Sequence, residues 1–179
     1  MTQHKVYVAQ KEEYKKGLEM IQEIKDYQKK NLAIGLNGDT FQPDNFLQYF
    51  TQRNIPFKYY VTNKGVTIGN TEAYQYNIEA IQNYIHQIQA YEEQQCHQCI
   101  EQLYKYEQNK WAIGLNGDNL QPDNFNIFYA ERQLTFHPYV RTNDGFQIGN
   151  KPTYKQNIEI LTKYLAEMGI KVKTMTTAH

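Results

Sequence analysis

The chain has 179 residues with 19 basic and 19 acidic side chains, so its formal net charge is zero. A general nucleic-acid-binding protein usually carries a basic surplus, because its affinity comes from neutralising phosphates, and this sequence has no such surplus. The sequence also contains no serine, which excludes mechanisms that use a serine nucleophile.

Residues 1–10 predict either a short edge strand around Val6 to Val8 or a flexible arm. This end of the chain is charged and has no apolar stretch, so it is not expected to be a signal peptide. No apolar run in the sequence approaches the ~18 residues that a membrane-spanning helix needs. Because the chain has only two cysteines, we expect a cytoplasmic protein in reducing surroundings.

A first helix is predicted over residues 11–30, and a matching helix over residues 92–108. The expected buried stripe of the first consists of apolar residues at three-residue steps: Leu18, Ile21, Ile24 and Tyr27. The last three of these correspond to residues 79 positions later in the second helix: Ile100, Leu103 and Tyr106. The chain therefore contains an internal repeat that includes this helix.

The motif AIGLNGDTFQPDNF at residues 33–46 occurs again as AIGLNGDNLQPDNF at residues 112–125, with twelve of fourteen residues identical. The ten residues after each copy share only an arginine, Arg53 and Arg132, so the similarity is concentrated in the motif. Its first four residues predict a short strand, followed by an Asn-Gly hairpin turn. The QPDN segment then predicts a helix with Pro43 at its first position, where a missing N–H costs nothing.

A β-hairpin is predicted after each motif, over residues 57–68 and 136–148, with Pro138 indicating a sheet edge. Each hairpin ends in IGN, whose asparagine suits a helix N-cap. The following helices carry apolar stripes at helical spacing: Tyr74, Ile78, Ile81 and Ile85 in one, and Tyr154, Ile158, Leu161 and Leu165 in the other. Residues 71–110 contain no glycine or proline, which predicts one long or kinked helix joining the two repeats.

Each repeat is thus an α-β-α-β-β-α unit of about 80 residues, and the fold class is α+β by tandem duplication. We predict an N-terminal arm or edge strand at residues 1–10, repeat units at 11–91 and 92–170, and a C-terminal tail at 171–179. Two such units are expected to pack about an approximate two-fold axis, either as an internal pseudo-dimer or within a homodimer.

The chemistry of the motif is acidic and rich in amides, and it holds four of the six aspartates of the chain. A phosphate ligand is disfavoured, because neither copy contains a lysine and the carboxylates already bring negative charge. Carboxylates and amides suit ligands that donate hydrogen bonds, such as an arginine or lysine of a protein partner, the edge of a guanine base, or sugar hydroxyls. The predicted binding residues are Asn37, Gly38, Asp39, Gln42, Asp44, Asn45, Asn116, Gly117, Asp118, Gln121, Asp123 and Asn124.

An architectural interpretation stays open beside this one, in which the motif is only a turn and a helix start. Six further residues shared by the repeats are candidates for lining a pocket: Arg53, Tyr74, Asn77, Arg132, Tyr154 and Asn157. Calcium is a weaker alternative, since the spacing does not match an EF-hand loop. A zinc site at Cys96, His97 and Cys99 is also disfavoured, because the first repeat has no counterpart. We therefore predict no metal ion and no cofactor.

The function that these residues favour is that of a small non-enzymatic binding or inhibitor protein, which binds a partner protein or a small ligand through the doubled motif. Short duplicated chains without catalytic residues are common among inhibitors encoded by phages and mobile elements. One alternative is a hydrolase or nucleotide-modifying enzyme that uses its carboxylates. Another is a single-stranded nucleic-acid binder that stacks bases on its 16 tyrosines, although nucleic acid is disfavoured by the neutral charge.

Overall fold

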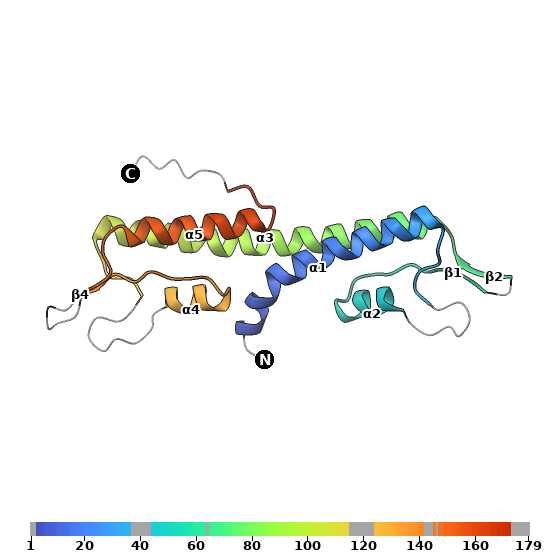
Figure 1. Cartoon of the computed structure of the whole chain (residues 1–179), viewed down its shortest axis with the longest axis horizontal. Helices are drawn as coiled ribbons and strands as arrows, with labels where there is room; N and C mark the ends of the chain where they lie inside the picture. The colour runs from blue at the N-terminus through green and yellow to red at the C-terminus, as the bar shows by residue number, and fades with distance from the viewer. Residues whose placement is uncertain are drawn as a thin grey trace. The chain divides into compact units, whose positions relative to one another are not determined.

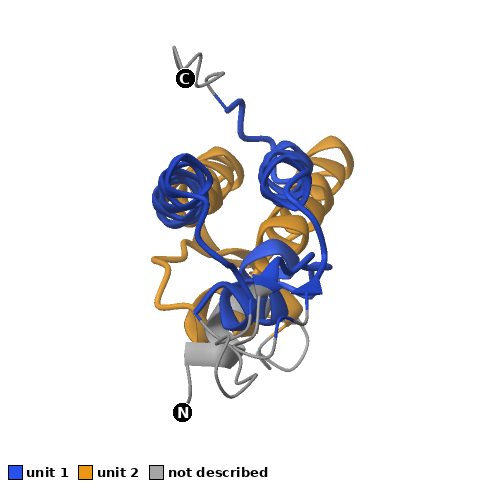
Figure 2. Cartoon of the chain, turned by 90° about the vertical axis from the view of Figure 1, so that its left-hand side faces the viewer, with its two compact units in different colours: residues 1–12, 89–179 blue, residues 13–88 orange. Residues whose placement is uncertain are grey.

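The computed structural model describes residues 3–36, 44–63, 65–114, 124–141, 145 and 147–172. These residues form five helices and two small antiparallel sheets, so the chain mixes helix and sheet, as the predicted α+β class requires. The chain divides into two compact units: unit 1 comprises residues 1–12 and 89–179, and unit 2 comprises residues 13–88 (Figure 2). Each unit contains one copy of the motif.

The elements follow one another in a repeating order along the chain (Figure 1). They are α1 (Gln3–Lys30), α2 (Asn45–Gln52), β1 (Tyr60–Asn63), β2 (Val66–Gly69), α3 (Glu72–Asn109), α4 (Asn124–Glu131), β3 (Val140–Arg141), β4 (Gln147–Ile148) and α5 (Thr153–Glu167). The uninterrupted α3 agrees with the absence of glycine and proline from this stretch. No helix in the described ranges is long and apolar enough to cross a membrane.

Helix α1 differs from the sequence prediction at two points. It begins at Gln3, so residues 3–10 are helical rather than a strand or an arm, and no glycine or proline separates them from the rest of the helix. Leu18 is 46% exposed and does not belong to the buried stripe, which contains Met20, Ile21 and Ile24. A step of three residues falls short of a full helical turn. Leu18 and Tyr27, which are three such steps apart, therefore lie about 180° from each other around the helix axis.

The core of unit 2 lies between α1, α2 and α3. Its buried side chains come from all three helices and from the motif: Met20, Ile21, Ile24, Ile34, Phe46, Tyr49, Phe50, Ala73, Tyr74, Ile78, Ile81 and Ile85. The predicted stripe of the third helix is therefore confirmed in this unit. The corresponding stripe in unit 1, from Tyr154 to Leu165, is also buried.

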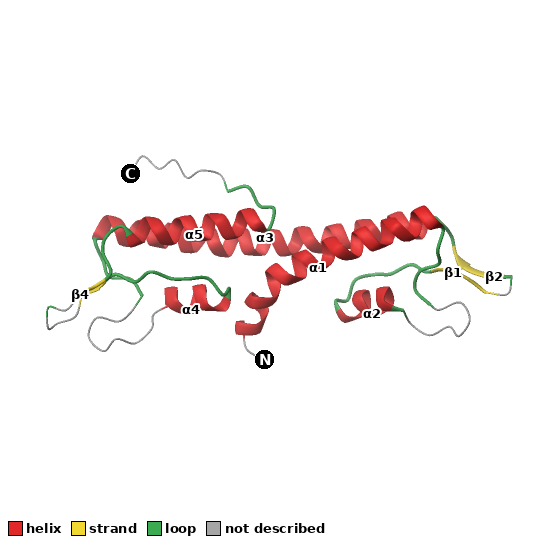
Figure 3. Ribbon diagram, in the orientation of Figure 1, coloured by secondary structure: helices red, strands yellow, loops and turns green. Residues whose placement is uncertain are grey.

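The strands are shorter than predicted (Figure 3). In unit 2, β1 pairs with β2 from Tyr60 opposite Gly69 to Asn63 opposite Val66. The expected strand at residues 33–36 is reduced to a single bridge between Ile34 and Tyr60. Unit 1 has the same plan: the described residues of β3 and β4, two in each strand, form a sheet, and a single bridge joins Ile113 and Tyr139.

The glycine that ends each hairpin permits a close backbone contact. Gly69 has φ +83, and a Cβ atom there would lie 1.6 Å from the carbonyl oxygen of Tyr59. Gly149 has φ +80, and its Cβ would lie 1.8 Å from the carbonyl oxygen of Pro138. Positive φ and this missing volume together explain why both IGN segments contain glycine.

Replacing Gly69 by alanine is expected to destabilise the protein severely. Gly65 provides a matched control, because its φ is +84 but no atom lies within 4 Å of its would-be Cβ. Gly65→Ala should cost about 1–2 kcal/mol for the left-handed backbone alone. Gly69→Ala should cost at least about 2 kcal/mol more, since the Tyr59 backbone must move. Urea unfolding followed by circular dichroism measures both, and equal losses would contradict the prediction.

Candidate functional site

The two ends of the first motif are held together by Asp44. Its Oδ2 atom accepts a hydrogen bond from the Gly35 N–H at 2.7 Å, and its own N–H donates to the Gly35 carbonyl oxygen at 3.0 Å. Its Oδ1 atom accepts from the N–H of Leu47 at 3.1 Å and so caps α2. The helix thus begins at Asn45 with Asp44 as its N-cap, two residues later than the start predicted at Pro43. The expected helical Pro43 lies outside the described residues.

Other shared motif residues in this unit have architectural roles. Ile34 is fully buried and Phe46 is 3% exposed. Gly35 has φ +114, and a Cβ atom there would lie 2.5 Å from the Tyr59 ring and 2.8 Å from the Phe57 ring. These positions tolerate little change because the core and the aromatic rings occupy the space around them.

The second motif shows related contacts. Gly114 has φ +110, and its would-be Cβ meets Pro138 at 2.7 Å and Phe136 at 2.8 Å. The side-chain amide of Asn126 donates a hydrogen bond to the Gly114 carbonyl oxygen. Ile113 is fully buried and Phe125 is 5% exposed, like their counterparts in unit 2.

Most of the predicted binding residues lie outside the described part of the chain: Asn37, Gly38, Asp39, Gln42, Asn116, Gly117, Asp118, Gln121 and Asp123. Of the other three, Asp44 closes the motif as described above. Asn45 and Asn124 are the exposed first residues of α2 and α4.

Four of the predicted pocket-lining residues instead brace the backbone. Asn77 is fully buried, accepts a hydrogen bond from the Lys58 N–H at 2.9 Å and donates to the Lys58 carbonyl oxygen at 2.7 Å. Asn157 makes the same pair of bonds with His137, at 2.9 and 2.8 Å. The hydroxyl groups of the two shared tyrosines donate to the backbone just before each motif, Tyr74 to Leu32 and Tyr154 to Trp111.

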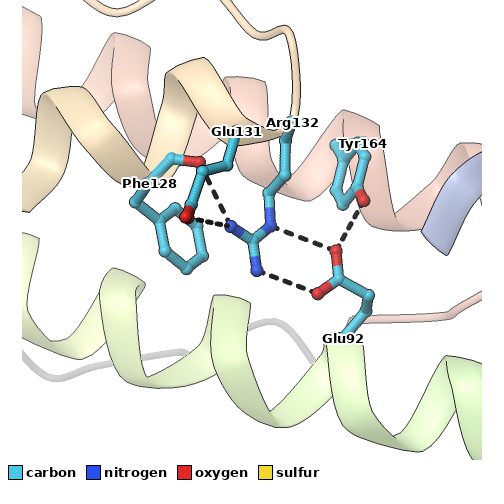
Figure 4. Close-up of polar contacts among 5 residues, drawn as sticks. All are labelled: Glu92, Phe128, Glu131, Arg132 and Tyr164. Atoms are coloured by element: carbon cyan, nitrogen blue, oxygen red, sulfur yellow. Dashed lines mark hydrogen bonds and ion pairs between the residues drawn. The ribbon is translucent and has the colours of Figure 1, made fainter. Parts of the chain in front are cut away.

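The two shared arginines form the most extensive polar arrangement of the described residues. In unit 1, Arg132 donates to both carboxylate oxygens of Glu92, at 3.0 and 2.9 Å (Figure 4). The Tyr164 hydroxyl donates to the same carboxylate at 2.5 Å. Arg132 also donates to the Phe128 carbonyl oxygen at 3.1 Å and lies 3.6 Å from the centre of the Phe128 ring. Its side chain and that of Glu92 are completely buried.

Unit 2 repeats this arrangement closer to the surface. Arg53 donates to Glu13 at 2.6 and 2.7 Å, Tyr84 donates to Glu13 at 2.6 Å, and the guanidinium lies 4.0 Å from the Tyr49 ring centre. The Arg53 and Glu13 side chains are 16% and 24% exposed. The carboxylates that pair with these arginines come from α1 and α3. The signal was available, because Glu13 and Glu92 are 79 residues apart, the offset of the repeat.

The burial of these groups changes their pKa values. Burial alone would raise the pKa of Glu13, but the hydrogen bonds from Arg53 and Tyr84 and the charge of Arg53 hold it below its usual value. Burial raises the pKa of Tyr84 and Tyr164 above the usual tyrosine value, and the hydrogen bond that each donates to a carboxylate adds to the effect. The lowered pKa of Glu13 favours its charged, paired form and does not suit a catalytic acid.

A pocket lies in the same place in each unit, beside the residues that follow the shared arginine. The unit 2 pocket has a volume of about 380 Å³ and includes Arg53, Asn83 and Gln87 in its lining. The unit 1 pocket, of about 440 Å³, has Lys163 and Glu167 at the positions that correspond to the two amides. The two pockets are therefore chemically different, although their surroundings repeat.

The remaining candidates are integrated into the fold. Cys96 and Cys99 are buried in α3 and form no disulfide, and burial raises the pKa of Cys96. His97 is exposed and lies 3.0 Å from Glu101 on the next helical turn. In the described ranges, no three His, Cys, Asp or Glu side chains are grouped so as to hold a metal ion. Six tyrosines are buried and cannot stack on bases: Tyr49, Tyr74, Tyr129, Tyr139, Tyr154 and Tyr164.

Comparison with known proteins yields no match, whether to protein-family models, to curated proteins or to solved structures. The function is therefore argued from the residues and their geometry.

The two glutamates are expected to differ in their importance for stability. Glu92→Gln removes the buried carboxylate that pairs with Arg132 and leaves Glu131, whose carboxylate oxygen lies 3.7 Å from the guanidinium, as a counter-charge; it should cost about 3 kcal/mol. Glu13→Gln, in the partly exposed copy, should cost no more than about 1 kcal/mol after solvent screening. Urea unfolding at neutral pH measures both free energies of unfolding. A loss for Glu13→Gln as large as that for Glu92→Gln would contradict this ranking.

The raised pKa of Tyr164 predicts a specific alkaline response. A tyrosine that holds its proton more tightly when folded stabilises the protein below the ordinary tyrosine pKa, and this contribution is lost as the pH rises toward the raised value. Above pH ~10, each such tyrosine steepens the fall in stability by about 1.4 kcal/mol per pH unit. Tyr164→Phe should be less stable at neutral pH but decline less steeply. An unchanged slope in urea unfolding across this range would count against the assignment.

Proposed function

We propose that the chain is a non-enzymatic binding protein that binds a partner protein or a small ligand through two equivalent segments of the motif, residues 37–43 and 116–122. The observation that carries this proposal is the division of labour within the motif. Gly35 and Asp44 hydrogen-bond to each other across the first copy of the motif, and Ile34 and Phe46 anchor it in the core. The identity of the two copies extends further, through Asn37, Gly38 and Asp39 and their counterparts.

The contrast between the motif and the pockets supports the loops as the shared site. A function common to both units requires residues that both units possess. The pocket linings differ, with amides in unit 2 where unit 1 has a lysine and a glutamate. Between residues 37 and 43, by contrast, five of seven positions are identical in the two copies. A shared ligand is thus better matched by the loops than by the pockets.

The residue before each motif adds an apolar element. Leu32 is 43% exposed, and its counterpart Trp111 is 46% exposed. The backbone carbonyl oxygen of Leu32 accepts a hydrogen bond from the hydroxyl of Tyr74 in α3, and that of Trp111 accepts one from Tyr154 in α5. An exposed apolar side chain that precedes an acidic segment in the sequence suits a partner that offers a basic group next to an apolar surface.

The recurrence of the contacts in both units supports tandem duplication as the origin of the chain. The Arg–Glu–Tyr arrangement, the Asn brace, the tyrosine-to-backbone bond and the single β-bridge each occur once per unit. Duplication followed by divergence explains why the contacts agree although most of the sequence does not.

The hydrolase alternative receives less support from the described residues. Both carboxylate oxygens of Asp44 accept backbone hydrogen bonds, and Glu13 and Glu92 are paired with arginines. A nucleic-acid binder is likewise less well supported, because six tyrosines are buried. Binding through Asp39 and Asp118 needs neither a catalytic acid nor exposed aromatic stacking.

The proposal predicts that Asp39→Asn combined with Asp118→Asn abolishes binding without unfolding the protein. Three probes represent the donor classes: an arginine-rich peptide, guanosine monophosphate and a neutral oligosaccharide. Binding is followed by amide chemical shifts and by Trp111 fluorescence, which reports on one place because the chain has a single tryptophan. One probe is expected to bind the unmodified protein, and the double variant should weaken this binding at least tenfold.

Asp44→Asn serves as the control for architecture. It should lower the free energy of unfolding by about 1 kcal/mol, because the asparagine oxygen can still cap α2 but its amide nitrogen cannot accept the hydrogen bond from the Gly35 N–H. The double variant, by contrast, should unfold at the same urea concentration as the unmodified protein. If the double variant unfolds like the cap variant, or if all three probes fail to bind, the proposed function is wrong.

A further inference from the structure

Strand β2 is an exposed edge of its sheet. The described part of unit 2 contains a two-stranded sheet in which β2 pairs with β1 along one side only. All four residues of β2 are exposed, including Val66 at 57% and Ile68 at 39%. A two-stranded hairpin is marginal on its own, and an unpaired edge offers its N–H and C=O groups to a further strand.

The edge carries an apolar face that continues from the buried interior. Ile68 lies directly opposite Val61, which is 1% exposed, so both side chains are on the same face of the sheet. Val66, two residues before Ile68, lies on this face as well. A further strand beside β2 would cover these two exposed side chains and extend the buried face.

The sequence of β2 matches a second copy of itself. It reads VTIG. Charged residues and proline usually protect an edge strand from pairing, and β2 contains neither. Antiparallel pairing of two copies about a two-fold axis at Thr67 would place Val66 opposite Ile68 of the second copy, twice. These apolar cross-strand pairs would form on one face, and a threonine pair on the other.

We propose that β2 is a homodimerisation edge, at which two copies of this chain join their hairpins into one four-stranded antiparallel sheet. The proposed edge lies in unit 2, where the described residues include all four positions of β2; in unit 1 the described part of β4 is Gln147–Ile148. The inference is independent of the proposed loop function, because it uses neither motif.

A disulfide between the copies tests the register. Two Thr67 residues facing each other across the axis would have Cα atoms about 4.5–5.5 Å apart, within the range of about 4.4–6.8 Å that a disulfide spans. Thr67→Cys should therefore give covalent dimers under mild oxidation. Thr62→Cys, on the inner strand, would be about 14 Å from its copy and should not. The natural Cys96 and Cys99 are buried in α3, which keeps the background low.

A lysine pair tests the association itself. The unmodified protein should show a concentration-dependent monomer–dimer equilibrium in sedimentation velocity, and Val66→Lys with Ile68→Lys should remain monomeric. Leu18→Lys with Ile127→Lys is the matched control, because it adds the same charge at side chains that are 46% and 49% exposed. This control should dimerise like the unmodified protein.

The proposal is overturned if the unmodified protein is monomeric at every concentration. It is also overturned if both lysine pairs dimerise equally, which would place the dimer contact on another surface. Cross-linking of Thr67→Cys at no more than the Thr62→Cys level would rule out this register and the interface with it. Circular dichroism confirms that each variant folds.

Discussion

The arginine that follows α4, Arg132, forms a completely buried ion pair on which the packing of unit 1 depends. In unit 1, Arg132 joins three elements, because Glu92 comes from α3, the arginine follows α4 and Tyr164 comes from α5. Burying both charges is costly, and the cost is offset only because the carboxylate receives three hydrogen bonds and the guanidinium also bonds to a backbone carbonyl. These contacts restrain the relative placement of the three helices, because moving any one of them would leave a buried charge without its hydrogen bonds.

In unit 2, the motif depends on the corresponding placement of α1, α2 and α3. Helices α1 and α3 form a surface on which α2 packs, and Asp44 links the start of α2 to Gly35. The third helix then fixes the chain on either side of the motif, through Tyr74 before it and Asn77 after it. The glycine stacks against aromatic rings of the following segment, which the asparagine holds in place. A chain of local contacts in unit 2 thus connects Arg53, at the end of α2, to the residues on both sides of positions 37–43.

The sequence predicts the helices better than the contacts between them. The stripes of the third helices and the uninterrupted α3 follow from spacing and from missing helix breakers, which are local properties. The Asn70 cap is also local, and its side chain accepts the Glu72 N–H at 2.9 Å. The partner of Arg53 is not local, since Glu13 lies forty residues earlier. Strand lengths were overestimated for the same reason, because pairing depends on neighbours that a single sequence does not specify.

The architectural and the binding interpretations of the motif are compatible in physical terms. A chain segment loses conformational entropy when it binds a ligand, and the loss is smaller when the residues on either side of it are already fixed. The hydrogen bonds between Gly35 and Asp44 fix the residues on either side of positions 37–43 in the folded chain. Under the proposed function, the residues that build the frame and the residues that meet the ligand are selected together, because a loose frame would weaken binding as surely as a wrong side chain. Identity across twelve of fourteen positions is then expected of the whole segment, although only part of it contacts the ligand.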